Sequence, residues 1–148
     1  MQSVLLLRLL QLASPSLPIG AYTYSQGLES AIEKGVVHHE QSAREWITES
    51  LNIIGDFEAP IAWRLMKAFS RRDSVAVNHW TECFIAARDT AEFRAETIQM
   101  GYSLSKLIID LKIADESLQS ILSDQPEIPL PTAFACATEA LGVPHEAA

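Results

Sequence analysis

The feature that most constrains the fold is a heptad stripe in the segment between residues 89 and 112. Its members are spaced 4-3-4-3-4 along the chain and are Phe93, Thr97, Met100, Leu104, Leu107 and Leu111. This spacing keeps one face of an α-helix largely apolar, and it predicts the central helix of a helical bundle. Gly101 and Ser105 are small residues one turn apart beside the stripe. Because glycine within a helix costs about 1 kcal/mol of helix propensity, the pair predicts that a neighbouring backbone crosses closely there.

Helical periodicity continues along most of the chain and predicts an all-α fold. No segment of strand length alternates apolar and polar residues, and the hairpin dipeptides Asn-Gly and Asp-Gly are absent. We therefore expect a single-domain helical bundle of about seven or eight helices over residues 1–148. The expected helices cover 2–13, 25–35, 42–54, a segment begun or kinked at Pro60, a segment from Asp73, 89–112, 114–123 and 132–141.

Polar residues mark two of the expected helix starts. Ser42 and Glu45 have the spacing of a capping box, and Asp73 is placed as an N-cap. The adjacent residues His38 and His39 diverge on a helix, which predicts a solvated loop pair. The face expected to be apolar after the capping box consists of Ala43, Trp46, Ile47, Leu51 and Ile54.

Charge and composition exclude several classes of protein. Nineteen acidic against eleven basic residues give a formal net charge of −8, which argues against nucleic acid as a partner because phosphate binding needs clustered Lys and Arg. No segment approaches the roughly 18–20 apolar residues of a membrane span, so no membrane association is expected. Two cysteines, Cys83 and Cys136, do not make a disulfide framework, and a cytoplasmic location is predicted.

No established catalytic motif is present, which leaves two weaker constellations. His79 and Cys83 are four residues apart in an expected helix, a spacing that allows both side chains to approach one nickel, zinc or copper ion. Glu92 and Glu96 lie one turn apart, and either could serve as the base of an enzyme. The alternative for the glutamates is a salt-bridge role, with Arg88 and Glu92 as an i,i+4 ion pair. No catalytic residue and no cofactor is predicted.

The segment from residue 13 to residue 29 is unusual for a connecting loop. Pro15 and Pro18 stiffen it, and five consecutive side chains with hydrogen-bonding groups follow at 22–26, bracketed by Gly20 and Gly27. A rigid loop rich in tyrosine suits partner recognition, because tyrosine contributes contact area at low entropic cost. The alternative is a purely structural loop whose hydroxyl groups cap the helix expected over 25–35.

Three segments together resemble the signature of UreF-type urease accessory proteins. Residues 14–29 match the pattern S-P-x-L-P-[IV]-G-A-[YF]-x-Y-S-x-G-L-E. Residues 88–94, followed by Met100 and Gly101, match R-x-T-x-E-[LF]-R with a downstream M-G. Residues 130–144, from Leu-Pro to Gly-Val-Pro, match a third element in kind. The order and spacing of the three make the resemblance specific over essentially the whole chain.

The resemblance implies a function in assembling the nickel centre of urease. Such proteins lack catalysis of their own, form homodimers when full length, and bridge a UreD/UreH-type scaffold and the UreG GTPase for nickel insertion into apo-urease. Carried over to this chain, the partner-binding candidates are Tyr22, Tyr24, Gln26 and Glu29. The alternative function is a nickel carrier that uses the histidine–cysteine pair described above. Because the family continues for a further C-terminal third, we expect the chain to be truncated. The residues themselves agree, since Gly142 is placed as a helix stop and Pro144 as the first residue of a further helix.

Overall fold

A computed structural model of the chain describes residues 2–144, and within this range it contains eight α-helices and no strand. The α-helices are α1 (Gln2–Leu12), α2 (Leu28–Glu33), α3 (Glu40–Ile53), α4 (Ala59–Ser70), α5 (Ser74–Ala86), α6 (Ala91–Asp110), α7 (Glu116–Ser123) and α8 (Leu130–Ala140). A 3₁₀ turn, η1 (Ala21–Thr23), and a π-helical turn, η2 (Ile54–Glu58), complete the order. The all-α prediction is confirmed. In the described part, no helix has the length and apolar character needed to cross a membrane.

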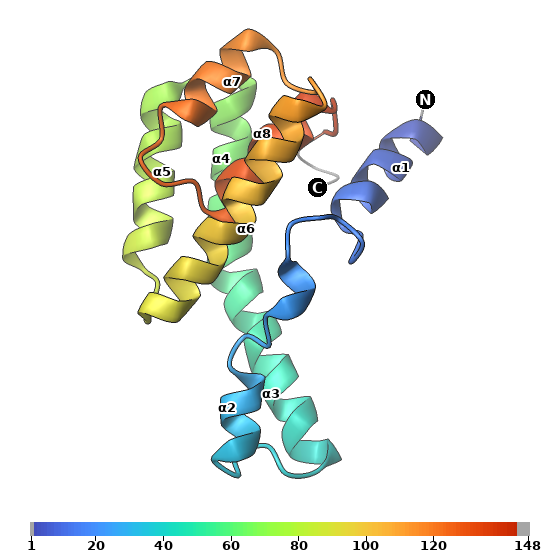
Figure 1. The fold of residues 1–148 in the computed structure, drawn as a ribbon, viewed down its shortest axis with the longest axis vertical. Coiled ribbons are helices and arrows are strands. Elements are labelled where there is room, and N and C mark those ends of the chain that lie inside the picture. Colours follow the sequence, from blue (N-terminus) through green and yellow to red (C-terminus); the bar gives the residue numbers. More distant parts are fainter. Residues whose placement is uncertain (1, 145–148) are drawn as a thin grey trace.

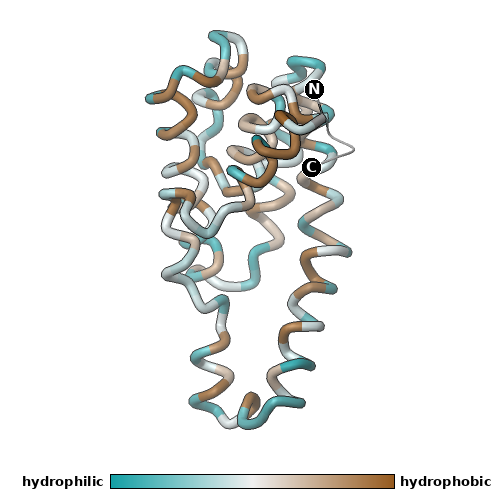
Figure 2. Tube along the Cα trace, turned by 90° about the vertical axis from the view of Figure 1, so that its right-hand side faces the viewer, coloured by the Kyte–Doolittle hydropathy of each residue, from teal (hydrophilic) through white to brown (hydrophobic). Residues whose placement is uncertain are grey.

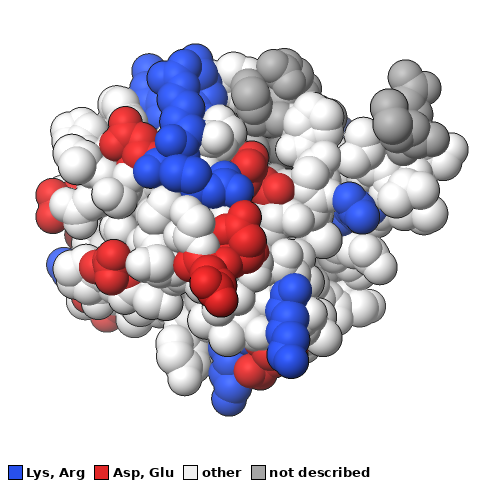
Figure 3. Space-filling model, turned by 90° about the horizontal axis from the view of Figure 1, so that it is seen from above, with Lys and Arg blue, Asp and Glu red and all other residues white. Residues whose placement is uncertain are grey.

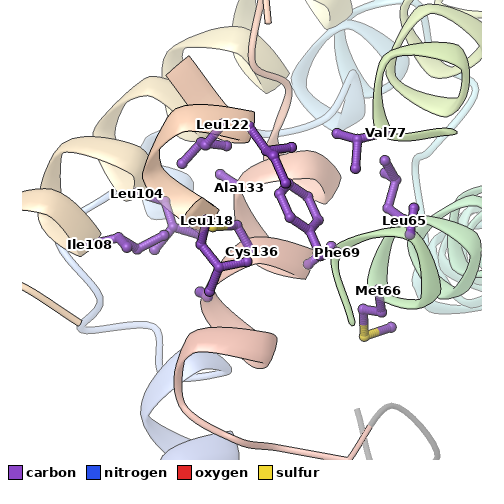
Figure 4. Packing of buried hydrophobic residues seen from close by; sticks show 14 of the residues in the cluster. Leu65, Met66, Phe69, Val77, Leu104, Ile108, Leu118, Leu122, Ala133 and Cys136 are labelled. Carbon is purple, nitrogen blue, oxygen red and sulfur yellow. The ribbon is translucent and has the colours of Figure 1, made fainter. Parts of the chain in front are cut away.

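The bundle is built around α8, which packs against α4, α6 and α7, while α5 packs against α4. Figure 1 shows this group of helices in one half of the molecule, with α2 and α3 extending away as a hairpin and α1 lying to one side. The core between these helices is continuous, and Figure 4 shows it from close by. Its largest fully buried apolar side chains include Phe69, Phe84, Leu65, Leu104, Ile108, Leu118 and Leu122.

The helices α3 and α4 follow one another through η2, so that residues 40–70 form one long helical path (Figure 2). Pro60 is near the start of α4, as expected. The apolar face expected on the first half is not buried in this structure, because α3 contains no buried residue, and Ile47 and Leu51 are 52% and 61% exposed. The physical reason is position: α3 projects beyond the bundle, whereas α4 packs against α5 and α8.

The start of α3 lies three residues earlier than the capping box predicted. His39 is the N-cap, and its Nδ1 atom accepts a hydrogen bond of 3.0 Å from the backbone amide of Ser42. The hydroxyl of Ser42 in turn accepts from the amide of His39 at 3.1 Å, so Ser42 occupies the third helical position instead of the cap. Both histidines are exposed, as predicted, but His39 has this capping role. The N-cap role of Asp73 is confirmed by a 3.0 Å hydrogen bond from the amide of Ala76.

The close backbone crossing predicted at Gly101 is present. A Cβ atom built there would lie 2.0 Å from the carbonyl oxygen of Ile128 and 2.6 Å from the carbonyl carbon of Pro129. The heptad stripe is buried only in part, because Leu111 is 61% exposed and Ile108 is buried in its place. A straight α-helix drifts by about 20° per heptad, which moves the end of the stripe off the packed face.

Charged side chains of both signs adjoin one another at the end of the bundle seen in Figure 3. Ion pairs between separate segments tie the bundle together. Arg72 donates to Glu139 and to Asp115, each at 2.9 Å.

At the C-terminal end of α8, Gly142 has a φ of 66°, which fits the predicted helix stop. Apart from Pro144 itself, the residues of the helix expected to begin there lie outside the described range.

Candidate functional site

The loop singled out in the sequence forms two left-handed turns around the short η1 segment. Gly20 and Gly27 have φ values of 80° and 83°, a conformation that glycine adopts without steric cost. Gln26 is also left-handed, with a φ of 50°. Two consecutive left-handed residues exclude helix, so α2 begins at Leu28 and not near residue 25 as predicted.

The four predicted partner-binding residues differ in their exposure to solvent. Tyr22 is 88% exposed on η1, Tyr24 is half-buried, and Gln26 and Glu29 are exposed. The N-cap of α2 is Gly27, and no side chain accepts a capping hydrogen bond there. The expected capping of this helix by hydroxyl groups of the loop is therefore wrong, although Ile19 of the same segment is buried in the core and Leu17 packs against it.

A pocket of about 400 Å³ connects the loop to the other two signature segments, and we call it the signature pocket. It lies where the carboxyl end of α5, the first half of α6 and the start of α8 meet the α3–η2 junction. Its lining residues are Gln26 from the loop; Ser50, Ile53, Ile54, Phe57 and Glu58 from α3 and η2; Phe84, Ala87, Arg88 and Asp89 from the end of α5 and the residues after it; Phe93, Glu96, Thr97 and Met100 from α6; and Leu130 and Pro131 from α8. All three signature segments thus contribute residues to one cavity.

Arg88 is the only basic residue in the lining, and it is held on several sides. Its side chain is 15% exposed, and its Nη1 atom donates to Glu58 at 2.8 Å. The guanidinium carbon lies 4.2 Å from the ring centroid of Phe84 and 5.4 Å from that of Phe57, both within the range of cation–π attraction. The predicted ion pair between Arg88 and Glu92 is wrong, because the chain leaves the helix between α5 and α6 and the two residues do not share a helix.

The two glutamates considered as possible catalytic bases occupy different environments. Glu92 is exposed in the first turn of α6, whereas Glu96 is half-buried and lines the signature pocket. Burial raises the pKa of the Glu96 carboxyl above its ordinary value. The neighbouring Arg94 pairs with Glu127 at 2.6 Å, so it joins α6 to the segment before α8. The structure therefore brings only one of the two glutamates into the pocket.

The candidate metal ligands His79 and Cys83 do lie side by side on α5, with 3.8 Å between Nε2 and Sγ. The adjacent Glu82 accepts a 3.1 Å hydrogen bond from Asn78. Over residues 2–144, no group of three or more His, Cys, Asp or Glu side chains is arranged to hold a metal ion. The pair thus offers two donor atoms and no third.

A second cavity, of about 520 Å³, separates α1 from α6 and α8. Its walls are mostly leucine side chains, among them Leu7 and Leu10 of α1, which are 61% and 56% exposed. From the middle of α1, Arg8 donates a hydrogen bond to the carbonyl of Leu141 after α8. This groove has no charged lining residue, which distinguishes it chemically from the signature pocket.

Reasoning from sequence missed three of the residues that define the signature pocket. Phe57 and Glu58 belong to the π-helical turn, and Phe84 is a core residue of α5 whose ring stacks on Phe57 with 6.1 Å between centroids. The available signal was Arg88 in the second signature segment. Two of its partners, Phe57 and Glu58, come from a segment about thirty residues away in the chain, and no local pattern points to them.

Comparison with known proteins gives consistent results. The family model described as UreF matches residues 37–148. The chain is 71% identical over 141 residues to the urease accessory protein UreF of Nitrosospira multiformis, an alignment that covers 95% of this chain and 62% of that protein. It is 62% identical over 149 residues to the urease accessory protein UreF of a Janthinobacterium species, covering 100% of this chain and 66% of that protein. The chain therefore spans less than two thirds of the length of these relatives.

Proposed function

The chain belongs to the UreF family of urease accessory proteins, and from that premise we propose that it acts by binding other proteins of urease maturation. In this proposal it bridges a UreD/UreH-type scaffold and a UreG-type GTPase while nickel is inserted into apo-urease. It performs no catalytic step of its own, works in the cytoplasm, and dimerises when it is part of a full-length protein. Nickel is the cargo of the assembly.

The observation that carries the proposal is the convergence of the three signature segments. They are separated by tens of residues in the chain, yet each contributes to the lining of the signature pocket. The exposed loop lies beside this pocket, because Gln26 lines it and the Cβ position of Gly27 is 3.5 Å from the ring of Phe93 on α6. A loop and a pocket that share one surface are suited to engage one partner together.

The loop also has the composition of a binding surface. Tyr22 presents 88% of its surface to solvent on a turn that Gly20 fixes. In this turn the hydroxyl of Thr23 donates to the carbonyl of Gly20 at 2.7 Å. A rigidly held, exposed tyrosine loses little freedom on binding, and tyrosines are enriched among residues that dominate interface energies. We propose that Tyr22, Tyr24, Gln26 and Glu29 contact the partner.

The test is co-purification of the tagged chain with its cognate UreD/UreH-type protein. Tyr22→Ala is expected to weaken the interaction about tenfold or more, as for a tyrosine at the centre of an interface. Tyr102→Ala is the matched control, because Tyr102 is also exposed, at 59%, but belongs to α6 and lines neither of the two cavities. Equal loss with both variants, or with neither, would contradict the assignment of the loop. Failure of the unmodified chain to bind would contradict the bridging function itself.

A further inference from the structure

The charges that face the signature pocket are unbalanced. Its lining includes three acidic residues, Glu58, Asp89 and Glu96, and one basic residue, Arg88. The positive charge of Arg88 is already paired with Glu58 at 2.8 Å. The pocket therefore presents excess negative charge, in a chain whose formal net charge is −8.

Glu96 differs from every comparable carboxylate in residues 2–144. Four acidic side chains in this range are half-buried, and three of them have an arginine partner: Glu58 pairs with Arg88, Glu127 with Arg94 and Glu139 with Arg72. Glu96 is the fourth, and no described residue forms a hydrogen bond or ion pair with its carboxylate. Partial burial of a carboxylate without a partner is unfavourable, which is also why the pKa of Glu96 is raised.

The walls around Glu96 indicate which ligand would offset this cost. Apolar surface is supplied by side chains that include Phe93, Met100 and Pro131. An acidic ligand would be repelled by the excess negative charge, and a purely apolar ligand would complete the desolvation of Glu96 without pairing it. A lysine or arginine side chain meets both requirements, because its aliphatic stem packs on apolar surface while its charged head pairs with a carboxylate.

We propose that the signature pocket receives a lysine or arginine side chain of a partner protein, which forms an ion pair with Glu96. This inference rests on the proposed function, since the partner is then the UreD/UreH-type or the UreG-type protein. Glu96 is thus a specificity-determining residue that selects a basic contact, and the exposed loop beside the pocket contributes the remaining contact area.

The test compares Glu96→Gln with Glu92→Gln in binding to purified UreD/UreH-type and UreG-type proteins. Glutamine keeps the size of glutamate and removes its charge. Because removing one member of a largely desolvated charge pair is costly, we expect Glu96→Gln to weaken binding to one of the two proteins about 10- to 100-fold. Glu92→Gln is the matched control, because Glu92 is an exposed glutamate one turn earlier on α6, and it should leave affinity unchanged.

A stability measurement excludes a trivial loss of folding. If Glu96 is an unpaired, partly buried charge in the isolated chain, Glu96→Gln should unfold at the same or a higher urea concentration than the unmodified chain. A charge-swap experiment then identifies the contact: Glu96→Lys is combined with single Lys→Glu or Arg→Glu substitutions across the partner surface, and one combination should restore binding. Restoration by none of them would overturn the proposal.

The outcomes separate this inference from the function on which it rests. Normal binding by the unmodified chain and equal binding by Glu96→Gln would overturn the basic-contact proposal and leave the bridging function standing. Absence of binding by the unmodified chain to both proteins would overturn the bridging function and the basic-contact proposal with it.

Discussion

The backbone crossing at Gly101 supports a quantitative prediction about stability. An alanine at this position would place its Cβ atom 2.0 Å from the carbonyl oxygen of Ile128, whereas real Cβ atoms essentially never approach other heavy atoms closer than 3.0 Å. Both close neighbours, Ile128 and Pro129, contribute backbone atoms that no side-chain rotation removes. The segment before α8 must therefore move by about 1 Å relative to α6, by comparison of these two distances.

The expected cost combines two effects of opposite sign. Overpacking of a well-packed contact costs about 1–3 kcal/mol, and the backbone clash puts Gly101→Ala at the upper end of that range. Alanine regains about 1 kcal/mol of helix propensity. The net prediction is a loss of about 2 kcal/mol in the free energy of unfolding, or about 4–8 °C in Tm for a chain of this size.

Gly55→Ala is the matched control for this experiment. Gly55 also lies in helical backbone, within η2, but a Cβ atom there has no heavy atom within 4 Å. This substitution should stabilise the protein by about 0.5–1 kcal/mol through helix propensity alone. Urea unfolding followed by circular dichroism at 222 nm measures both variants. An unfolding free energy of Gly101→Ala equal to or above that of the unmodified chain would refute the close crossing.

Three further predictions concern buried and titrating groups. The hydroxyls of Thr81 and Thr132 form a buried hydrogen bond of 2.9 Å, so Thr132→Val should cost about 1–3 kcal/mol by urea unfolding and the double valine variant should cost less than the sum of the single ones. The pKa of Asp115 is lowered chiefly by the hydrogen bond from the amide of Leu118. The stability that Asp115 contributes is present above its unfolded-state pKa and is lost as pH falls through its folded-state pKa, so the Tm difference between the unmodified chain and Asp115→Ala should shrink in acid. Burial raises the pKa of the Cys136 thiol to about 12, so a thiol reagent at pH 8 should modify at most one cysteine in the folded chain and two in denaturant.

The sequence was sufficient to predict features that depend on neighbouring residues along the chain. The all-α class follows from periodicity, and the cap at Asp73 follows from one side chain and the amide three residues on. The crossing at Gly101 was predictable because a glycine within a strong helix pattern has few explanations besides a packing requirement. Each of these features has a local signal, and the structure confirms each.

Features that depend on distant segments were not predictable in the same way. The pairing of Arg88 with Glu92 assumed an uninterrupted helix, and the break at residues 87–90 allows Arg88 to reach Glu58 instead. The cap at Ser42 was misplaced because the ring nitrogen of His39 accepts from the amide of Ser42 itself and starts the helix three residues earlier, and histidine is not among the usual Ser, Thr, Asp and Asn caps. The signature pocket required the fold, since its lining comes from five separate parts of the chain.

The π-helical turn between α3 and α4 has a consequence for the two apolar stripes of that long helix. Ile47, Leu51 and Ile54 are followed at helical spacing by Ile61 and Leu65, so an uninterrupted α-helix would align all of them on one side. An extra residue in the turn rotates everything after it by about 100°. As a result, the second stripe, Ile61 and Leu65, is buried in the core, whereas the first stripe, Ile47, Leu51 and Ile54, is exposed. Converting residues 54–58 to regular α-helix without changing their number would bring the two stripes into phase, and the π-helical turn therefore sets which way the projecting hairpin presents its apolar side.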